Sequence, residues 1–340
     1  MTRTYDLIKQ KPGEKSEPLR LSDIENLKSE ERGSDVAVSQ GRKDLEDAKK
    51  MYINLQNYMR ELRGKVMNNQ PIQLETALSL IHRITESRNT SEKMYQLTID
   101  FGHEKDYYIS QPINTMVYAT MIGWRMGYSH IKLTELALSA LLHDIGMFMI
   151  PEHIVNKEEP LSESELSLIK GHPEMGKNCL FSFKDDFPWL VRAVHEHHER
   201  ENGQGYPRGI IGDEIIEYAK IIGICDSYEA MTHNRPYKKA IMPFASVMEL
   251  IETKNLSFSP KILKIFLEEI SLYPMGSYVK LNNMSIGRVI ATHKDQPLRP
   301  IIKILFNGQG DRVTEEKIIN LKENIVLNIL SGISEEEFPH

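Results

Sequence analysis

The stretch Ser139-Ala-Leu-Leu-His143-Asp144-Ile-Gly-Met147 decides the interpretation of this chain. It continues a Leu- and Ala-rich helical pattern that begins at Leu133, so the adjacent His143 and Asp144 end a buried helix. An imidazole beside a carboxylate in such a place is typical of a metal site, because both groups are ligands of transition metals. The pair therefore predicts a metal centre at the end of a core helix.

Residues of the same two ligand types follow in separate segments of the chain. They are His172, the adjacent His197 and His198, and Asp226 within the apolar run 221–226. Imidazole and carboxylate ligands together suit iron, manganese, zinc or copper, and a ligand set without Cys argues against a zinc ribbon. A mixed set with carboxylates favours hydrolytic chemistry.

The ordered set of motifs resembles the HD-GYP family, a branch of the HD-domain metal-dependent phosphohydrolases. The resemblance covers about residues 107 to 305 and implies an all-α HD-type bundle that hydrolyses cyclic di-GMP at a binuclear metal centre. Iron is the first choice for the two divalent metals, and manganese is the second. The motifs that carry the resemblance are His143-Asp144-Ile-Gly, His172, His197-His198-Glu199-Arg200, Asn202-Gly-Gln-Gly-Tyr206-Pro207 and Asp226.

The resemblance implies a role for each ligand residue. Asp144 bridges the two metals and, together with Asp226, counts as a catalytic residue. The second metal is bound by His143 and Asp226, while the first has three imidazole ligands. These three imidazoles belong to His172, His197 and His198.

Other motif residues are expected around the metals. Glu199 is expected to orient a ligating imidazole through the free N–H of that ring. Tyr206 is expected to contact the substrate, and Arg235 and Lys238 lie in the loop where the family meets phosphate oxygens. The alternative interpretation of 235–239 is a solvated basic loop.

Two departures from the family pattern fall on the His143 side of the centre. Gln111 stands where the family has a metal-binding His, and an amide oxygen is a weaker ligand than an imidazole. Met147 stands where a Lys usually closes the motif, so a cation near the attacked phosphate is missing. The leading hypothesis is therefore a slow phosphodiesterase. Two alternatives stay open: a degenerate cyclic di-GMP receptor or protein-interaction module, and a phosphohydrolase of another nucleotide.

The composition is that of an ordinary globular chain and limits the classes of partner that we expect. The 340 residues are 40% hydrophobic and 26% charged, with a net charge of −6. We expect no DNA or RNA polymer as a partner, because no broad basic footprint is present. Two Cys and no apolar run of membrane-spanning length predict a cytoplasmic protein without membrane attachment.

The chain divides into three predicted parts. Residues 1–100 are a helical region for regulation or dimerisation, 101–275 are the HD-GYP metal-binding domain, and 276–340 are a small β-containing extension. Before Leu45, glycines are expected to interrupt any long helix.

After Leu45, apolar residues recur at helical spacing, as Met51, Leu55, Tyr58 and Leu62 illustrate. This apolar stripe packs on the catalytic domain or against a second chain in a homodimer. The family resemblance also implies a diguanylate-cyclase-type protein partner, reached through the Gly205-Tyr-Pro surface.

Overall fold

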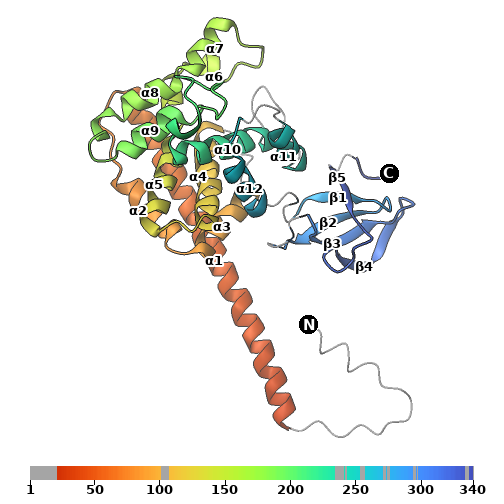
Figure 1. Ribbon diagram of the computed structural model, residues 1–340. Helices are drawn as coiled ribbons and strands as arrows, with labels where there is room; N and C mark the ends of the chain where they lie inside the picture. The colour runs from red at the N-terminus through yellow and green to blue at the C-terminus, as the bar shows by residue number, and fades with distance from the viewer. Residues whose placement is uncertain are drawn as a thin grey trace, which may run out of the picture. The chain divides into compact units, whose positions relative to one another are not determined.

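The computed structural model describes residues 21–100, 107–233, 241, 243–252, 257–270, 273, 276–293, 296, 298–333 and 337–339. Within these ranges the chain is mainly helical and ends in a small antiparallel sheet, as Figure 1 shows. The predicted class, a helical bundle with a C-terminal β extension, is confirmed. In the described part of the chain, no helix combines the length and the apolar character that crossing a membrane requires.

The helices follow one another with short connections through most of the described chain. They are α1 (Leu21–Met67), α2 (Glu75–Thr85), α3 (Arg88–Asp100), α4 (Tyr107–Arg125), α5 (His130–Leu142), α6 (Glu152–Val155), α7 (Glu163–Lys170), α8 (His172–Cys179), α9 (Pro188–Glu196), α10 (Glu217–Thr232), α11 (Pro243–Glu252) and α12 (Pro260–Glu269).

Helix α1 is continuous over 47 residues and passes through Gly33 and Gly41. The prediction that glycines interrupt this region is therefore wrong. A glycine inside a helix costs only about 0.5 to 1 kcal/mol relative to alanine, and a long helix tolerates that. By internal contacts the chain divides within this helix, into residues 1–47 and 48–340.

The apolar stripe of α1 is covered within the chain from Ala48 onward. Tyr52, Leu55 and Leu62 are 0%, 0% and 2% exposed. The hydroxyl of Tyr52 donates a hydrogen bond of 2.7 Å to Oδ1 of Asn114 in α4. Of the two interpretations of this stripe, packing on the catalytic domain is confirmed, so the stripe gives no argument for a homodimer.

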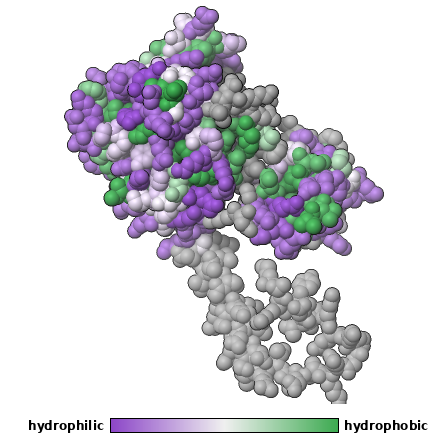
Figure 2. All heavy atoms as spheres, in the orientation of Figure 1, coloured by the Kyte–Doolittle hydropathy of each residue, from purple (hydrophilic) through white to green (hydrophobic). Residues whose placement is uncertain are grey.

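Helices α4, α5, α9 and α10 bring the motif residues together. Helix α4 packs against α5 and α10, while α9 packs against α5 and α8. Helix α4 is buried over residues 109–123, and α5 is buried over residues 136–142. On the face drawn in Figure 2, hydrophilic residues cover most of the bundle and hydrophobic ones form small separate groups.

Local capping agrees with the sequence pattern at α7. Ser162 is the N-cap of this helix, and its hydroxyl accepts a hydrogen bond from the backbone N–H of Glu165. The carboxylate of Glu165 accepts the N–H of Ser162 in return, which completes a capping box of the Ser-x-x-Glu type.

The C-terminal sheet has the strand order β4-β3-β2-β1-β5, and every neighbouring pair is antiparallel. One row of side chains forms its core, with Val279, Val289 and Ile302 at most 1% exposed. All five strands lie within residues 276–340, where the sequence predicts a β-containing extension. The strands are β1 (Tyr278–Leu281), β2 (Ile286–Ala291), β3 (Ile301–Phe306), β4 (Arg312–Asn320) and β5 (Ile329–Ile333).

Candidate metal centre

The predicted ligands come from the ends of three helices and the middle of a fourth. His143 caps the C-terminus of α5, and Asp144 begins the 3-10 turn that follows. His172 is the first residue of α8, His197 caps α9, and Asp226 lies inside α10. The packing of these helices therefore brings residues from widely separated segments to one place.

Two ligand groups share Asp144, and in each group one ligand atom per residue lies within 4.8 Å of the others. We call Asp144, His172, His197 and His198 the imidazole group. We call His143, Asp144 and Asp226 the carboxylate group. Their role as metal ligands remains a prediction, and their geometry agrees with the two metal positions expected.

The two oxygens of Asp144 face different groups. Its Oδ1 lies 3.1 Å from Nε2 of His172 and 3.6 Å from Nε2 of His197. Its Oδ2 lies 3.5 Å from Nε2 of His143. A carboxylate placed in this way suits a bridge between two cations.

Backbone carbonyl groups hold three of the imidazoles in position. In each case the ring Nδ1 contacts the carbonyl oxygen three residues earlier. Because a carbonyl only accepts hydrogen bonds, Nδ1 carries the proton, and the neutral ring then offers Nε2 to a metal. The three contacts are His143 to Ala140 at 2.7 Å, His172 to Ile169 at 2.8 Å and His197 to Val194 at 2.7 Å.

Burial and charge act differently on the two groups. Burial lowers the pKa of His197 to about 4 and that of His198 well below its usual value, so both rings are neutral at pH 7. Burial also opposes charge on His143 and Asp144. Their mutual attraction prevails, raising the pKa of His143 to about 9 and holding that of Asp144 well below its usual range.

Gln111 reaches the carboxylate group with its nitrogen. Its Nε2 donates a hydrogen bond of 2.7 Å to Oδ1 of Asp226 and lies 3.2 Å from Nε2 of His143. Gln111 as a metal ligand stays a prediction: in this arrangement the amide presents its N–H group, which has no lone pair to offer, and its oxygen has no hydrogen-bond partner. The structure does place Gln111 in the centre, as the motif position requires.

The donor set fits divalent metals at the imidazole group. It offers three imidazoles and an ionised carboxylate, which iron and manganese accept in mixed N/O sites. The carboxylate group supplies fewer ligands, and the amide of Gln111 already bonds to one of them.

Glu199 holds the loop that follows α9. Its Oε1 accepts the backbone N–H of Arg208 at 2.7 Å, and its Oε2 accepts that of Ile210 at 3.2 Å. The prediction that Glu199 orients a ligating imidazole is therefore wrong. Both carboxylate oxygens are used by the backbone of the loop, while carbonyl groups orient the rings.

The same loop places Tyr206 against the metal ligands. The Tyr206 ring stacks on the imidazole of His198, with 4.6 Å between centroids and 26° between planes. Gly205 allows this close approach, because a Cβ there would lie 2.4 Å from Cα of Glu199. Burial raises the pKa of Tyr206, so its phenol stays protonated. The predicted substrate residues Arg235 and Lys238 lie outside the described residues.

Lys170 is a cation near the centre that the sequence interpretation missed. Its ammonium lies 5.8 Å from the centroid of the Tyr206 ring. No carboxylate partner of Lys170 occurs among the described residues, whereas Lys157 and Lys177 pair with Glu165 and Glu174. Its position two residues before His172 was the available signal.

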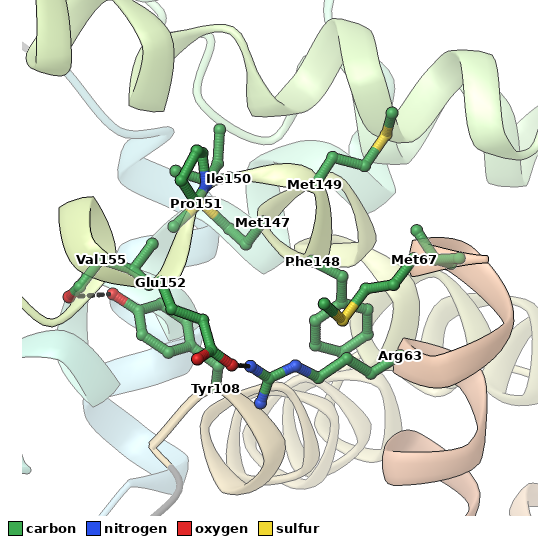
Figure 3. A pocket seen from close by; sticks show the side chains of 11 residues that line it. Arg63, Met67, Tyr108, Met147, Phe148, Met149, Ile150, Pro151, Glu152 and Val155 are labelled. Atoms are coloured by element: carbon green, nitrogen blue, oxygen red, sulfur yellow. Dashed lines mark hydrogen bonds and ion pairs between the residues drawn. The ribbon is translucent and has the colours of Figure 1, made fainter. Parts of the chain in front are cut away.

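Met147 lies in the wall of a separate pocket. Figure 3 shows this cavity of about 300 Å³, lined by Met67, Tyr108, Met147 and Met149 among others, with the Arg63–Glu152 ion pair at one side. Met147 is half-buried and packs against the buried cluster of Ile150, Ile154 and Val155. The chain therefore uses this motif position for apolar packing.

A buried polar network lies one turn beyond Asp226. The carboxylate of Glu229, 1% exposed, accepts hydrogen bonds from Tyr107 at 2.8 Å and from Asn114 at 3.1 Å. Since Asn114 also bonds to Tyr52, the network joins α1 and α4 to the helix that carries Asp226. Sequence spacing did not single out Glu229.

Comparison with known proteins gives two family matches. An HD domain matches residues 60–262, and a KOW domain associated with HD domain matches residues 278–340. The first match covers more than half of the chain. The second gives an independent description of the C-terminal sheet.

Curated relatives share the helical region. The cyclic di-GMP phosphodiesterase PA4108 of Pseudomonas aeruginosa is 32% identical over 187 residues, covering 55% of this chain and 45% of that protein. The cyclic di-GMP phosphodiesterase PdeB of Borreliella burgdorferi is 30% identical over 233 residues, covering 68% and 61%. The 3'3'-cGAMP-specific phosphodiesterase 3 of Vibrio cholerae is 31% identical over 170 residues, covering 50% and 36%. The chain thus spans between about a third and three fifths of these relatives.

A solved structure agrees with the fold. Bd1817, an HDG"Y"P protein from Bdellovibrio bacteriovorus, aligns with a TM-score of 0.54 and 15% identity, covering 70% of this chain and 79% of that one. At this identity the likeness concerns the fold alone. The HD-domain match and the curated relatives agree: the chain belongs to the HD-domain family, and its ordered motifs resemble those of the HD-GYP branch.

Proposed function

We propose that the protein is a metal-dependent phosphodiesterase that opens a cyclic dinucleotide, with cyclic di-GMP as the first candidate substrate. The observation that carries the proposal is Asp144, whose two oxygens face two separate ligand groups. The names of the curated relatives support cyclic di-GMP, and 3'3'-cGAMP is the related alternative.

Divalent metal ions held by the two groups would supply Lewis acidity, which lowers the pKa of water and offsets phosphate charge. Iron is our first choice and manganese the second, because imidazole and carboxylate ligands occur together. The imidazole group is the better site, since it has more ligands and the lowered pKa values of His197 and His198 keep both rings neutral. Asp144 and Asp226 are the carboxylates that set the negative charge of the centre.

The surrounding residues would bind and orient the substrate. Tyr206 keeps its phenol proton and can donate a hydrogen bond to a phosphate or ribose oxygen beside His198. The ammonium of Lys170 lies over the Tyr206 ring. Lys170 is our candidate for attracting a phosphate that the metals do not bind. Glu199 fixes the loop between them through the backbone of Arg208 and Ile210.

The decisive experiment is hydrolysis of cyclic di-GMP by the full chain supplied with Fe²⁺ or Mn²⁺, compared with His197→Ala and His195→Ala. His195 is a matched control, because it lies on the same helix but pairs with Glu174 at 2.6 Å instead of facing Asp144. We expect His197→Ala to lose turnover and His195→Ala to keep it. Absence of hydrolysis of both cyclic di-GMP and 3'3'-cGAMP would contradict the proposal.

A second candidate function is a cyclic di-GMP receptor with little or no turnover. Two observations favour it: Met147 is committed to apolar packing, and Gln111 turns an N–H group to the carboxylate group. Tight binding of cyclic di-GMP without turnover, lost on replacing Tyr206 by Ala, would identify the receptor.

A further inference from the structure

The amide of Gln111 has a position that the proposed chemistry does not explain. Gln111 is 1% exposed, and its nitrogen lies 2.7 Å from Oδ1 of Asp226 and 3.2 Å from Nε2 of His143. These two atoms are themselves 3.7 Å apart. The amide nitrogen therefore lies beside both atoms that a metal in the carboxylate group would need.

The orientation of this amide depends on charge. Its oxygen has no hydrogen-bond partner, and it is the one buried side-chain polar atom in that condition among the described residues. Without a metal ion, only the N–H side of the amide can bond to Asp226, because an amide oxygen and a carboxylate oxygen are both acceptors. A cation beside Asp226 reverses the preference, since it attracts the amide oxygen and repels the N–H group.

We infer that Gln111 closes the second metal position. At rest its N–H group occupies Asp226, so the protein holds one metal in the imidazole group and admits a second only when the amide turns over. The inference rests on the proposed function only in taking the centre to bind metal. It makes the second metal, and with it the fully loaded state, dependent on metal concentration.

A poor ligand and a competing hydrogen-bond donor predict opposite results for one substitution. If Gln111 were only a weak ligand, a side chain without N or O atoms would weaken the second position further. If Gln111 competes with the metal, the same side chain strengthens that position, because Asp226 loses the N–H that occupies it. Gln111→Met makes this distinction, since Met is similar in length and has no donor.

The test is calorimetric titration of the metal-free full chain with Mn²⁺, for wild type, Gln111→Met and Gln111→His. We expect wild type to have one tight site and one weak site. The weak, second site of wild type should bind Mn²⁺ about tenfold or more weakly than the second site of Gln111→Met. Gln111→His, which adds an imidazole, should bind two Mn²⁺ tightly. Gln56→Met is the matched control: Gln56 is another buried Gln, with Nε2 3.5 Å from Oγ of Ser110, away from the ligand groups.

Two Mn²⁺ ions bound with equal affinity by wild type would overturn the inference, and so would a second site in Gln111→Met no tighter than in wild type. Gln111→Leu, which also lacks a donor, replaces Gln111→Met if circular dichroism shows that the latter is unfolded. Turnover is measured separately. An inactive protein with the expected affinities contradicts the proposed phosphodiesterase and leaves this inference standing.

Discussion

The imidazole group and the carboxylate group share Asp144, yet they are built in opposite ways. His172 and His197 are held by backbone carbonyls with Nε2 directed to Asp144, and burial keeps His197 neutral. In the carboxylate group, His143 has a pKa raised to about 9 despite its burial, and Asp226 bonds to Gln111. The imidazole group presents its Nε2 atoms to a cation, whereas in the carboxylate group a cation must first displace the hydrogen bond from Gln111.

This comparison teaches that a bridging carboxylate does not make two metal positions equal. The metal affinity of each position depends on the groups that already form hydrogen bonds to its ligand atoms. The contrast between the two groups can be tested at the bridge, at single ligands and at the loop that covers them.

The largest effect is expected at the bridge itself. Asp144→Asn removes the negative charge that both groups share, so metal should be lost from both and turnover should fall on the order of 10³-fold. Metal analysis and hydrolysis of cyclic di-GMP measure the two effects. Asp213→Asn, at an exposed carboxylate, is the control. Retention of metal by Asp144→Asn would show that the two groups bind independently.

Single ligands should separate the groups. His172→Ala should weaken the tightly held metal by about 100-fold or more, because an imidazole of the complete group is lost. His143→Ala should leave that metal in place. Metal content during graded chelation is the measurement. Equal losses in the two variants would contradict the asymmetry.

A smaller effect is expected at the loop over the imidazole group. The two carboxylate oxygens of Glu199 accept the backbone N–H groups of Arg208 and Ile210. Glu199→Gln removes the negative charge and replaces one of these acceptor oxygens by an NH₂ group. Stability should fall by about 2 kcal/mol, which lowers Tm by about 4 to 8 °C. Thermal unfolding of the metal-free protein measures this, with exposed Glu158→Gln as the control. An unchanged Tm would mean that these hydrogen bonds do not hold the loop.

The smallest effect concerns the substrate side. Lys170→Met removes an exposed cation above Tyr206, so KM for cyclic di-GMP should rise about fivefold, about 1 kcal/mol, with kcat little changed. The effect should shrink at high salt. Lys177→Met, whose ammonium already pairs with Glu174, should leave KM unchanged. Equal KM values for the two variants would remove Lys170 from substrate recognition.

The sequence determined the helical class, the end of α5 at His143 and the capping box of α7, because each depends on local periodicity or on a short motif. It also determined which residues meet at the centre, through an ordered set of motifs that resembles one family. It did not determine that α1 continues through Gly33 and Gly41, because a helix of 47 residues absorbs the local cost of glycine.

Only the tertiary structure decided which contacts the side chains at the motif positions make. Glu199 serves a loop backbone, Met147 fills an apolar cluster, and Gln111 turns its N–H group to Asp226. Sequence spacing names the residue at a site. Hydrogen bonds and burial depend on neighbours from other segments, so the folded structure alone decides which atom of that residue faces its partner.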